Sequence, residues 1–270
     1  MKNILITGCS TGIGFETAMH LKAKGHNVYA TARKQKDVED LKKLGFDAIY
    51  LDVKDYGSIS DTIEYVLQKA KTIDVLFNNA GYGQIGALQD IETIHLKEQF
   101  DTNVFGLHEV TRQILPIMKK QGYGKIINHS SVLGIISLKF RGAYNASKYA
   151  IEGLSDTLRL ELSDTNISVS LLNTGPVTSK FRENAVKNFK ETVDIENSEY
   201  KEIYLENLNK NKSDVPFNLE AIEVAKIVDK IINTKKPKPR YYITKATYIL
   251  GYLKRILSTT QLDFVLNKVE

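Results

Sequence analysis

The sequence predicts an α/β fold in which one parallel sheet is covered by helices on both faces. Short apolar runs alternate along the chain with segments of helical periodicity, the order typical of a doubly wound sheet. No low-complexity linker or internal repeat divides the 270 residues. A chain of this length also suffices for one large core. We therefore expect a single domain over residues 1–270 with a seven-stranded sheet.

The expected elements come in the order strand, helix, strand. The strands are predicted at residues 4–7, 27–31, 48–52, 75–78, 125–129, 167–172 and 240–243, and the helices at 13–24, 57–70, 93–120, 143–163 and 219–233. Because parallel strands need crossover connections, each helix should return across one face of the sheet. The short apolar strands indicate burial on both faces.

Residues 180–218 interrupt this alternation. They are polar, rich in Asn, Lys and Glu, and have only a weak helical pattern. They come directly after the sixth strand, whose carboxyl end is where such sheets bind ligands. We therefore expect one or two short helices that form a substrate lid, while a surface excursion without a function remains the alternative.

Charge and composition exclude several classes of protein. The net charge is +5, but residues 1–234 carry 29 Lys and Arg against 30 acids, so the excess lies in the tail. Without a broad basic face or a recognition motif, we expect no nucleic-acid partner. The single cysteine, Cys9, allows no internal disulfide, and no cluster of His, Cys and Asp has metal-ligand spacing. The expected location is cytoplasmic, since no signal peptide or apolar spanning segment is present.

The C-terminal segment, residues 245–270, is basic and contains a helix-like stretch. Its apolar residues recur at helical spacing: Tyr248, Ile249, Tyr252, Leu253, Ile256 and Leu257. Such a stripe usually packs on its own domain or on a partner subunit. The alternative is peripheral contact with an anionic membrane, which an apolar face beside cations also suits.

A glycine-rich turn joins the first strand to the first helix. It contains Gly8, Ser10, Thr11, Gly12, Ile13 and Gly14. Glycines let a backbone approach a pyrophosphate closely, and the N-terminus of the next helix offers free N–H groups to the anion. Placed between a strand and a helix, this turn predicts a Rossmann-type dinucleotide site.

The end of the second strand indicates which dinucleotide binds. An NAD site usually has an acid there for the ribose 2′-hydroxyl. Here the strand ends in Arg33, which suits a 2′-phosphate, and no acid occurs before Asp37. We therefore expect NADP(H). At the end of the third strand, Asp52, with Val53 next to it, is expected at the adenine, although Asp52 also suits a helix cap.

Tyr144 and Lys148 lie four residues apart in the helix predicted at 143–163. This spacing places both side chains on one helix face. A nearby ammonium stabilises a phenolate and lowers the pKa of the tyrosine towards values useful for proton transfer. Such a pair arises often by chance, so it needs support from other motifs.

That support comes from a resemblance to the short-chain dehydrogenase/reductase family. The matching segments are Thr7-Gly8-x-x-x-Gly12-Ile13-Gly14, Asn78-Asn79-Ala80-Gly81, Asn103, Ser130-Ser131 and Tyr144-x-x-x-Lys148. They occur in the family's order and spacing over about residues 3–181. The phosphate turn and the second strand look most like NADP(H)-preferring members, including hydroxysteroid and retinol dehydrogenases.

The resemblance implies a role for each residue. Tyr144 would be the general acid and base, and Lys148 would hold the nicotinamide ribose and lower the pKa of Tyr144. Ser131 would polarise the carbonyl, since it has the family's spacing to Tyr144, which leaves Ser130 structural. Asn103 would position a proton-relaying water. The residues expected to line the cofactor are Asn79, Ala80, Gly81, Gly175 and Val177.

Thr174 departs from the family pattern, which has proline before Gly175. This change is expected to loosen the loop after the sixth strand without removing a catalytic group. The expected function is carbonyl–alcohol interconversion by hydride transfer with NADP(H). The alternatives are a catalytically silent NADP(H)-binding scaffold or redox sensor, which has no need for all four catalytic residues, and an extended epimerase or dehydratase, which the chain length disfavours.

The expected substrate is a hydrophobic carbonyl compound. The candidate pocket residues after the fourth and fifth strands are apolar or aromatic: Tyr82, Ile85, Leu133, Ile135 and Phe140. Long helices at 93–120 and 143–163 resemble those that pair across family interfaces, so a homo-oligomer is also expected.

Overall fold

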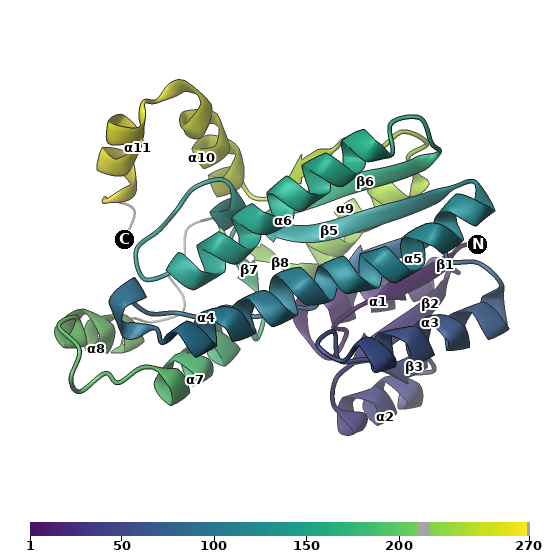
Figure 1. Cartoon of the computed structure of the whole chain (residues 1–270), viewed down its shortest axis with the longest axis horizontal. Coiled ribbons are helices and arrows are strands. Elements are labelled where there is room, and N and C mark those ends of the chain that lie inside the picture. The colour runs from purple at the N-terminus through teal and green to yellow at the C-terminus, as the bar shows by residue number, and fades with distance from the viewer. Residues whose placement is uncertain (210–216, 269–270) are drawn as a thin grey trace.

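The computed structural model, which describes residues 1–209 and 217–268, has a seven-stranded parallel sheet at its centre (Figure 1). The strand order is β3-β2-β1-β4-β5-β6-β9. The strands are β1 (Asn3–Ile6), β2 (Asn27–Ala32), β3 (Asp47–Tyr50), β4 (Val75–Asn78), β5 (Gly124–Ser131), β6 (Ile167–Thr174) and β9 (Arg240–Tyr242). The order reverses between β1 and β4, so their carboxyl ends define the crevice where such sheets bind ligands. The predicted single-domain, doubly wound fold is confirmed.

Helices cover both faces of the sheet. On one face lie α1 (Gly12–Ala23), α2 (Gln35–Lys43) and α9 (Ala221–Asn233), and on the other lie α3 (Tyr56–Ala70), α5 (Leu107–Gln121) and α6 (Gly142–Glu161). Alternation along β1 explains the two layers, because Ile4 and Ile6 join the first core and Leu5 joins the second. All three side chains are fully buried, which accounts for the continuous apolar run.

The helix predicted at 93–120 is divided in the structure. It consists of α4 (Thr93–Phe100), a π-helical turn η2 (Asp101–Gly106) and α5. An extra residue in the π turn rotates α5 relative to α4, and such turns often lie at functional sites. Helix α2 was not predicted because it is highly charged and buries only Val38 and Leu41.

The segment at 180–218 contains two packed helices, α7 (Phe181–Thr192) and α8 (Lys201–Asn209). Phe189, Val193 and Tyr204 are buried in a separate cluster with Ala87. Part of the predicted lid, residues 210–216, lies outside the described residues. After it, β8 (Leu219–Glu220) pairs with β7 (Val177–Thr178) in a separate two-stranded sheet.

The C-terminal segment folds as α10 (Lys245–Ile256) and α11 (Thr259–Leu266), at the end of the molecule near the start of α6 (Figure 1). Leu250, Leu253 and Leu257 pack against the 3-10 turn η3 (Val132–Gly134) and Tyr144. The tail therefore packs on its own domain. Within residues 1–209 and 217–268, no helix combines the length and apolarity needed to cross a membrane.

Candidate active site

The phosphate turn requires glycine at several positions. Gly8 and Gly12 have φ values of 73° and 62°, in the left-handed region that favours glycine. A Cβ on Gly14 would lie 2.2 Å from the carbonyl oxygen of Gly8, so no side chain fits there. The N-cap residue Thr11 makes no side-chain cap hydrogen bond, which leaves the first N–H groups of α1 available to an anion.

Asn79 holds this turn in place. Its Nδ2 donates to the carbonyl oxygens of Thr7 and Gly8 at 3.0 and 2.9 Å. The hydroxyl of Thr7 accepts in return from the backbone N–H groups of Asn79 and Ala80 at 3.0 and 2.9 Å. The Asn79 side chain therefore ties the end of β4 to the turn rather than facing a ligand, a use that the motif alone did not reveal.

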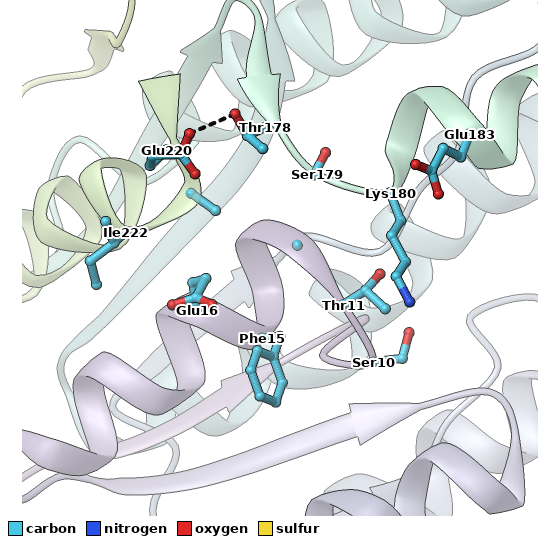
Figure 2. A pocket seen from close by; sticks show the side chains of 12 residues that line it. Ser10, Thr11, Phe15, Glu16, Thr178, Ser179, Lys180, Glu183, Glu220 and Ile222 are labelled. Carbon is cyan, nitrogen blue, oxygen red and sulfur yellow. Dashed lines mark hydrogen bonds between the residues drawn. The ribbon is translucent and has the colours of Figure 1, made fainter. Parts of the chain in front are cut away.

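A cavity of about 680 Å³ opens beside the phosphate turn (Figure 2). Ser10, Thr11 and Gly12 line one side, and Thr178, Ser179 and Lys180 line the other, whereas Ile13 points into the first core. Figure 2 shows the Lys180 amine directed towards Ser10 and Thr11. Sequence analysis missed Lys180. A cation two residues after β7, in the segment that follows β6, was the signal that could have identified it.

The predicted 2′-phosphate residue, Arg33, comes directly after β2 and is exposed. Burial raises the pKa of Tyr82 to about 12, and the positive charge of Arg33 acts against this rise. Because β2 pairs in parallel with β1, the position of Arg33 after β2 is on the same sheet edge as the phosphate turn.

Asp52 does not cap α3, so the helix-cap alternative for this residue is wrong. The cap is Asp55, whose carboxylate accepts from the N–H groups of Gly57 and Ser58 at 3.0 and 3.3 Å. Asp52 instead accepts from the Lys54 N–H at 3.0 Å in a local turn. The neighbouring Val53 is buried and packs against Gly106 of η2. A Cβ added to Gly106 would lie only 2.7 Å from the Cβ of Val53.

Tyr144 and Lys148 lie one turn apart on α6. The Lys148 Nζ is 5.5 Å from the centroid of the Tyr144 ring and donates to the carbonyl oxygen of His129 at 2.6 Å. Burial lowers the pKa of Lys148 to about 8, opposed by the carboxylate of Glu152. Burial raises the pKa of Tyr144, and a hydrogen bond with Ser131 works in the opposite direction. Lys148 therefore stays a cation near pH 7, beside a phenol that needs such help to ionise.

The two adjacent serines differ in their surroundings. Ser131 lies beside Tyr144 and lowers the pKa of its phenol. The Ser131 Oγ accepts from the Leu133 N–H at 3.1 Å and donates to the Thr174 carbonyl at 3.3 Å. Ser130 is fully buried and donates to Glu152 instead. The geometry therefore favours Ser131 over Ser130 as the partner of Tyr144 in chemistry.

Asn103 lies inside η2 and is almost fully buried. Its Oδ1 accepts from the Tyr82 N–H at 3.1 Å, and its Nδ2 donates to the Tyr82 carbonyl and the Ser147 hydroxyl at 2.9 and 3.2 Å. The π turn thus joins Asn103 to α6 at the residue preceding Lys148. This hydrogen bond to Ser147 therefore links Asn103 to α6, the helix that carries Tyr144 and Lys148.

The loop after β6 is tied down although it lacks the expected proline. The Thr174 hydroxyl lies 3.0 Å from His129 Nε2. A Cβ on Gly175 would lie 2.1 Å from the Thr244 hydroxyl, so glycine is required where the loop passes the start of α10. Val177 then pairs with Leu219. The expectation of a looser loop is therefore not what the structure shows.

Apolar side chains surround Tyr144 on the substrate side. The Phe181 ring of α7 lies 5.5 Å from the Tyr144 ring, and Leu133 and Ile135 belong to the same cluster as Tyr144. Ile85 and Phe140 pack instead against the α7 and α8 cluster. Side chains of α7 and α10 therefore both pack beside Tyr144. In the part of the chain that the structure describes, no group of His, Cys, Asp and Glu suits a metal ion.

The sheet, phosphate turn and Tyr144–Lys148 pair together define a dinucleotide-binding oxidoreductase. The family model for short chain dehydrogenases matches residues 2–190, so the chain belongs to the short-chain dehydrogenase/reductase family. It is 36% identical to an uncharacterized oxidoreductase, YbbO, of Escherichia coli (strain K12), over 98% of this chain and 94% of the relative.

Two further comparisons agree. Human 17-beta-hydroxysteroid dehydrogenase type 1 is 31% identical over 90% of this chain and 77% of that protein. A short-chain dehydrogenase from Streptomyces avermitilis, solved by crystallography, superposes with a TM-score of 0.79 at 26% identity, covering 100% of this chain and 96% of that one. The resemblance seen in the motifs is thus confirmed, including its likeness to hydroxysteroid dehydrogenases.

Proposed function

We propose that this oxidoreductase interconverts a carbonyl and an alcohol with NADP(H), using Tyr144 as general acid and base. The observation that supports the proposal most is the cluster of Ser131, Tyr144 and Lys148 at the carboxyl end of β5 and the start of α6. Ser10, Thr11 and Gly12 line the cavity beside the phosphate turn, and the first N–H groups of α1 have no side-chain cap there, so the residues present fit the pyrophosphate of the cofactor.

In this mechanism each protein group has a distinct task. When bound, the cofactor would supply the hydride in reduction or accept it in oxidation at the substrate carbon. In reduction, the hydroxyls of Ser131 and Tyr144 donate hydrogen bonds to the carbonyl oxygen, and Tyr144 gives its proton to that oxygen as it becomes an alcohol. The Lys148 ammonium stabilises the resulting phenolate. Oxidation reverses these proton movements.

The test of this function is a screen of ketones, aldehydes and alcohols with NADPH or NADP⁺, monitored at the nicotinamide absorbance. Apolar walls around Tyr144 favour hydrophobic substrates, in keeping with the steroid named for the human relative. The rival proposal, a silent NADP(H) sensor, expects tight cofactor binding without turnover of any compound in the screen.

NADP(H) preference is proposed from Arg33, the exposed cation at the end of β2. The change of Arg33 to Asp should lower kcat/KM with NADPH by about 10²-fold or more, because a phosphate then faces an anion instead of a cation. The same change should leave kcat/KM with NADH equal or higher. Steady-state kinetics with both cofactors measure this ratio, and Lys36→Asp on the exposed surface of α2 is the matched charge control. A wild-type enzyme that prefers NADH contradicts the proposal.

A homo-oligomer is proposed through the outer faces of α5 and α6. Large apolar side chains are exposed on or beside these helices: Phe105, Tyr149, Leu154 and Leu160. Three of these side chains lie on α6, and Phe105 lies in η2 just before α5. Such an exposed apolar set suits a symmetric interface. Light scattering at micromolar concentration is expected to give a mass at least twice 30.4 kDa. A monomeric mass contradicts this proposal.

The exposed side of α10 is proposed to contact an anionic membrane. The helix has two apolar faces, since Leu250, Leu253 and Leu257 pack inward while a second set faces solvent. That second set is 51 to 64% exposed and consists of Tyr248, Ile249, Tyr252 and Ile256. Lys245, Lys254 and Arg255 on the same helix are also exposed, and each cation near an anionic surface contributes about 1 kcal/mol.

Cosedimentation with vesicles tests this contact. Wild type should pellet with phosphatidylserine-containing vesicles at low salt and less at moderate salt, since the attraction is screened. Tyr252→Ser with Ile256→Ser should remain in the supernatant, whereas Leu44→Ser, an exposed apolar change at the end of α2, should pellet normally. Point substitutions are preferable to deletion of the tail because the inward leucines pack beside Tyr144. Wild type that stays in the supernatant at both salts removes the membrane from the proposal.

A further inference from the structure

His129, near the end of β5, links three parts of the site that come from distant positions in the sequence. Its ring Nδ1 lies 3.1 Å from Asn79 Oδ1, and its ring Nε2 lies 3.0 Å from the Thr174 hydroxyl. Its backbone carbonyl accepts the Lys148 ammonium at 2.6 Å. One residue thus contacts the anchor of the phosphate turn, the end of β6 and the catalytic lysine.

The hydrogen-bond partners fix the protonation of the ring. Asn79 Nδ2 faces two carbonyl oxygens, those of Thr7 and Gly8, which can only accept, so the amide nitrogen and oxygen of Asn79 are assigned unambiguously. Asn79 Oδ1 can then only accept a hydrogen bond, so His129 Nδ1 must be protonated and donate to it. In a neutral ring Nε2 is left as an acceptor. The Thr174 hydroxyl therefore donates to Nε2 at 3.0 Å in preference to the Ser130 carbonyl oxygen, which lies farther away at 3.4 Å.

The surroundings keep the ring neutral. Burial lowers the pKa of His129 to about 3, and the nearby Lys148 ammonium acts in the same direction. The facing groups are Asn79, Thr174 and the Phe77 ring at 6.1 Å, none of which is an anion. Thr174 therefore has a specific use at the position where the family has proline, because a proline would leave Nε2 without a donor.

We infer that His129 and Thr174 act as a coupled positioning pair, in which a neutral Nδ1–H imidazole connects the phosphate turn, through Asn79, to the loop that begins at Gly175. The pair acts through other residues and does not touch the reacting atoms. Its effect on cofactor binding rests on the proposed NADP(H) function. The tautomer does not, because it is determined by contacts within the protein alone.

The tautomer is tested by NMR on protein labelled with ¹⁵N-histidine, with His129→Phe used to assign the signals. The ring is expected to show the neutral Nδ1–H pattern unchanged between about pH 5 and about pH 8, the range in which an ordinary histidine titrates. Thr174→Val should shift the Nε2 signal, and Thr174→Ser should not. A ring that titrates in this range, or that carries its proton on Nε2, overturns the inference.

The coupling is tested by the NADPH dissociation constant of matched variants. Thr174→Val removes the donor at nearly constant shape and should raise Kd about tenfold, whereas Thr174→Ser should stay within about twofold of wild type. In a His129→Phe background, adding Thr174→Val should change Kd little, because the acceptor is already absent. Equal effects of Thr174→Val in both backgrounds overturn the pair. If wild type binds no NADPH, the proposed function fails while the NMR result still decides the tautomer.

Discussion

Replacement of Tyr144 by phenylalanine is expected to lower kcat on the order of 10²-fold or more while NADPH still binds. The change removes only the hydroxyl, which lies beside Ser131 and transfers the proton in the proposed mechanism. The ring remains to pack against Phe181 and the η3 cluster. Steady-state turnover of a substrate from the screen and NADPH titration by fluorescence measure the two effects separately.

Tyr149→Phe is the matched control. Tyr149 lies on the same helix, and its hydroxyl donates to the Ile135 carbonyl at 2.7 Å, so the change also removes one hydrogen bond. Because Tyr149 is partly exposed and outside the catalytic cluster, its variant should retain near-normal turnover. Near-normal turnover in Tyr144→Phe would remove Tyr144 from the mechanism.

The fold was predictable from the sequence because each strand is buried on both faces. Ile4, Leu5 and Ile6 all lie in the core, which gives an apolar run that no amphipathic helix would show. Helix α2 lacked any comparable signal, since only Val38 and Leu41 contact the core. The π turn was also invisible, because residues 101–106 lie inside one continuous segment whose spacing predicts a single helix over 93–120.

The tail illustrates a limit of periodicity. Sequence spacing groups Leu253 and Leu257 with Tyr252 and Ile256 in one stripe. In the structure the leucines pack beside Tyr144, whereas Tyr252 and Ile256 face solvent. Helical spacing identifies which residues are neighbours, but the orientation of a helix is set by the surface on which it packs.

The site was predictable where a motif fixes backbone geometry and unpredictable where side chains from distant segments meet. The glycines at 8, 12 and 14 have the conformations or close approaches that the motif implies. In contrast, His129 resembled a plain strand-end residue, and Thr174 resembled the loss of a proline. Their contact joins positions 45 residues apart, so neither residue alone revealed it.

Lys148→Met is expected to lower alcohol oxidation near pH 7 on the order of 10²-fold, with residual activity that rises with pH. In the wild type the Lys148 pKa of about 8 keeps the ammonium largely charged at pH 7, beside the Tyr144 ring. Methionine keeps an unbranched chain in the same space but removes the charge. Burial then raises the pKa of Tyr144 with no cation to oppose it, so the phenolate that oxidation needs forms only at higher pH.

The measurement is kcat/KM for oxidation as a function of pH, with Lys139→Met as the control. Lys139 is exposed, so this control removes one positive charge from the surface and leaves the buried Lys148 in place. In this pH profile, kcat/KM for oxidation rises where Tyr144 and Lys148 titrate as a coupled pair. The rise should move to higher pH in Lys148→Met and stay in place in Lys139→Met. Reduction needs the neutral phenol. At pH values below this rise, kcat/KM for reduction should therefore fall less in Lys148→Met than kcat/KM for oxidation does. If the rise stays at the same pH in Lys148→Met, the ammonium does not set the ionisation of Tyr144.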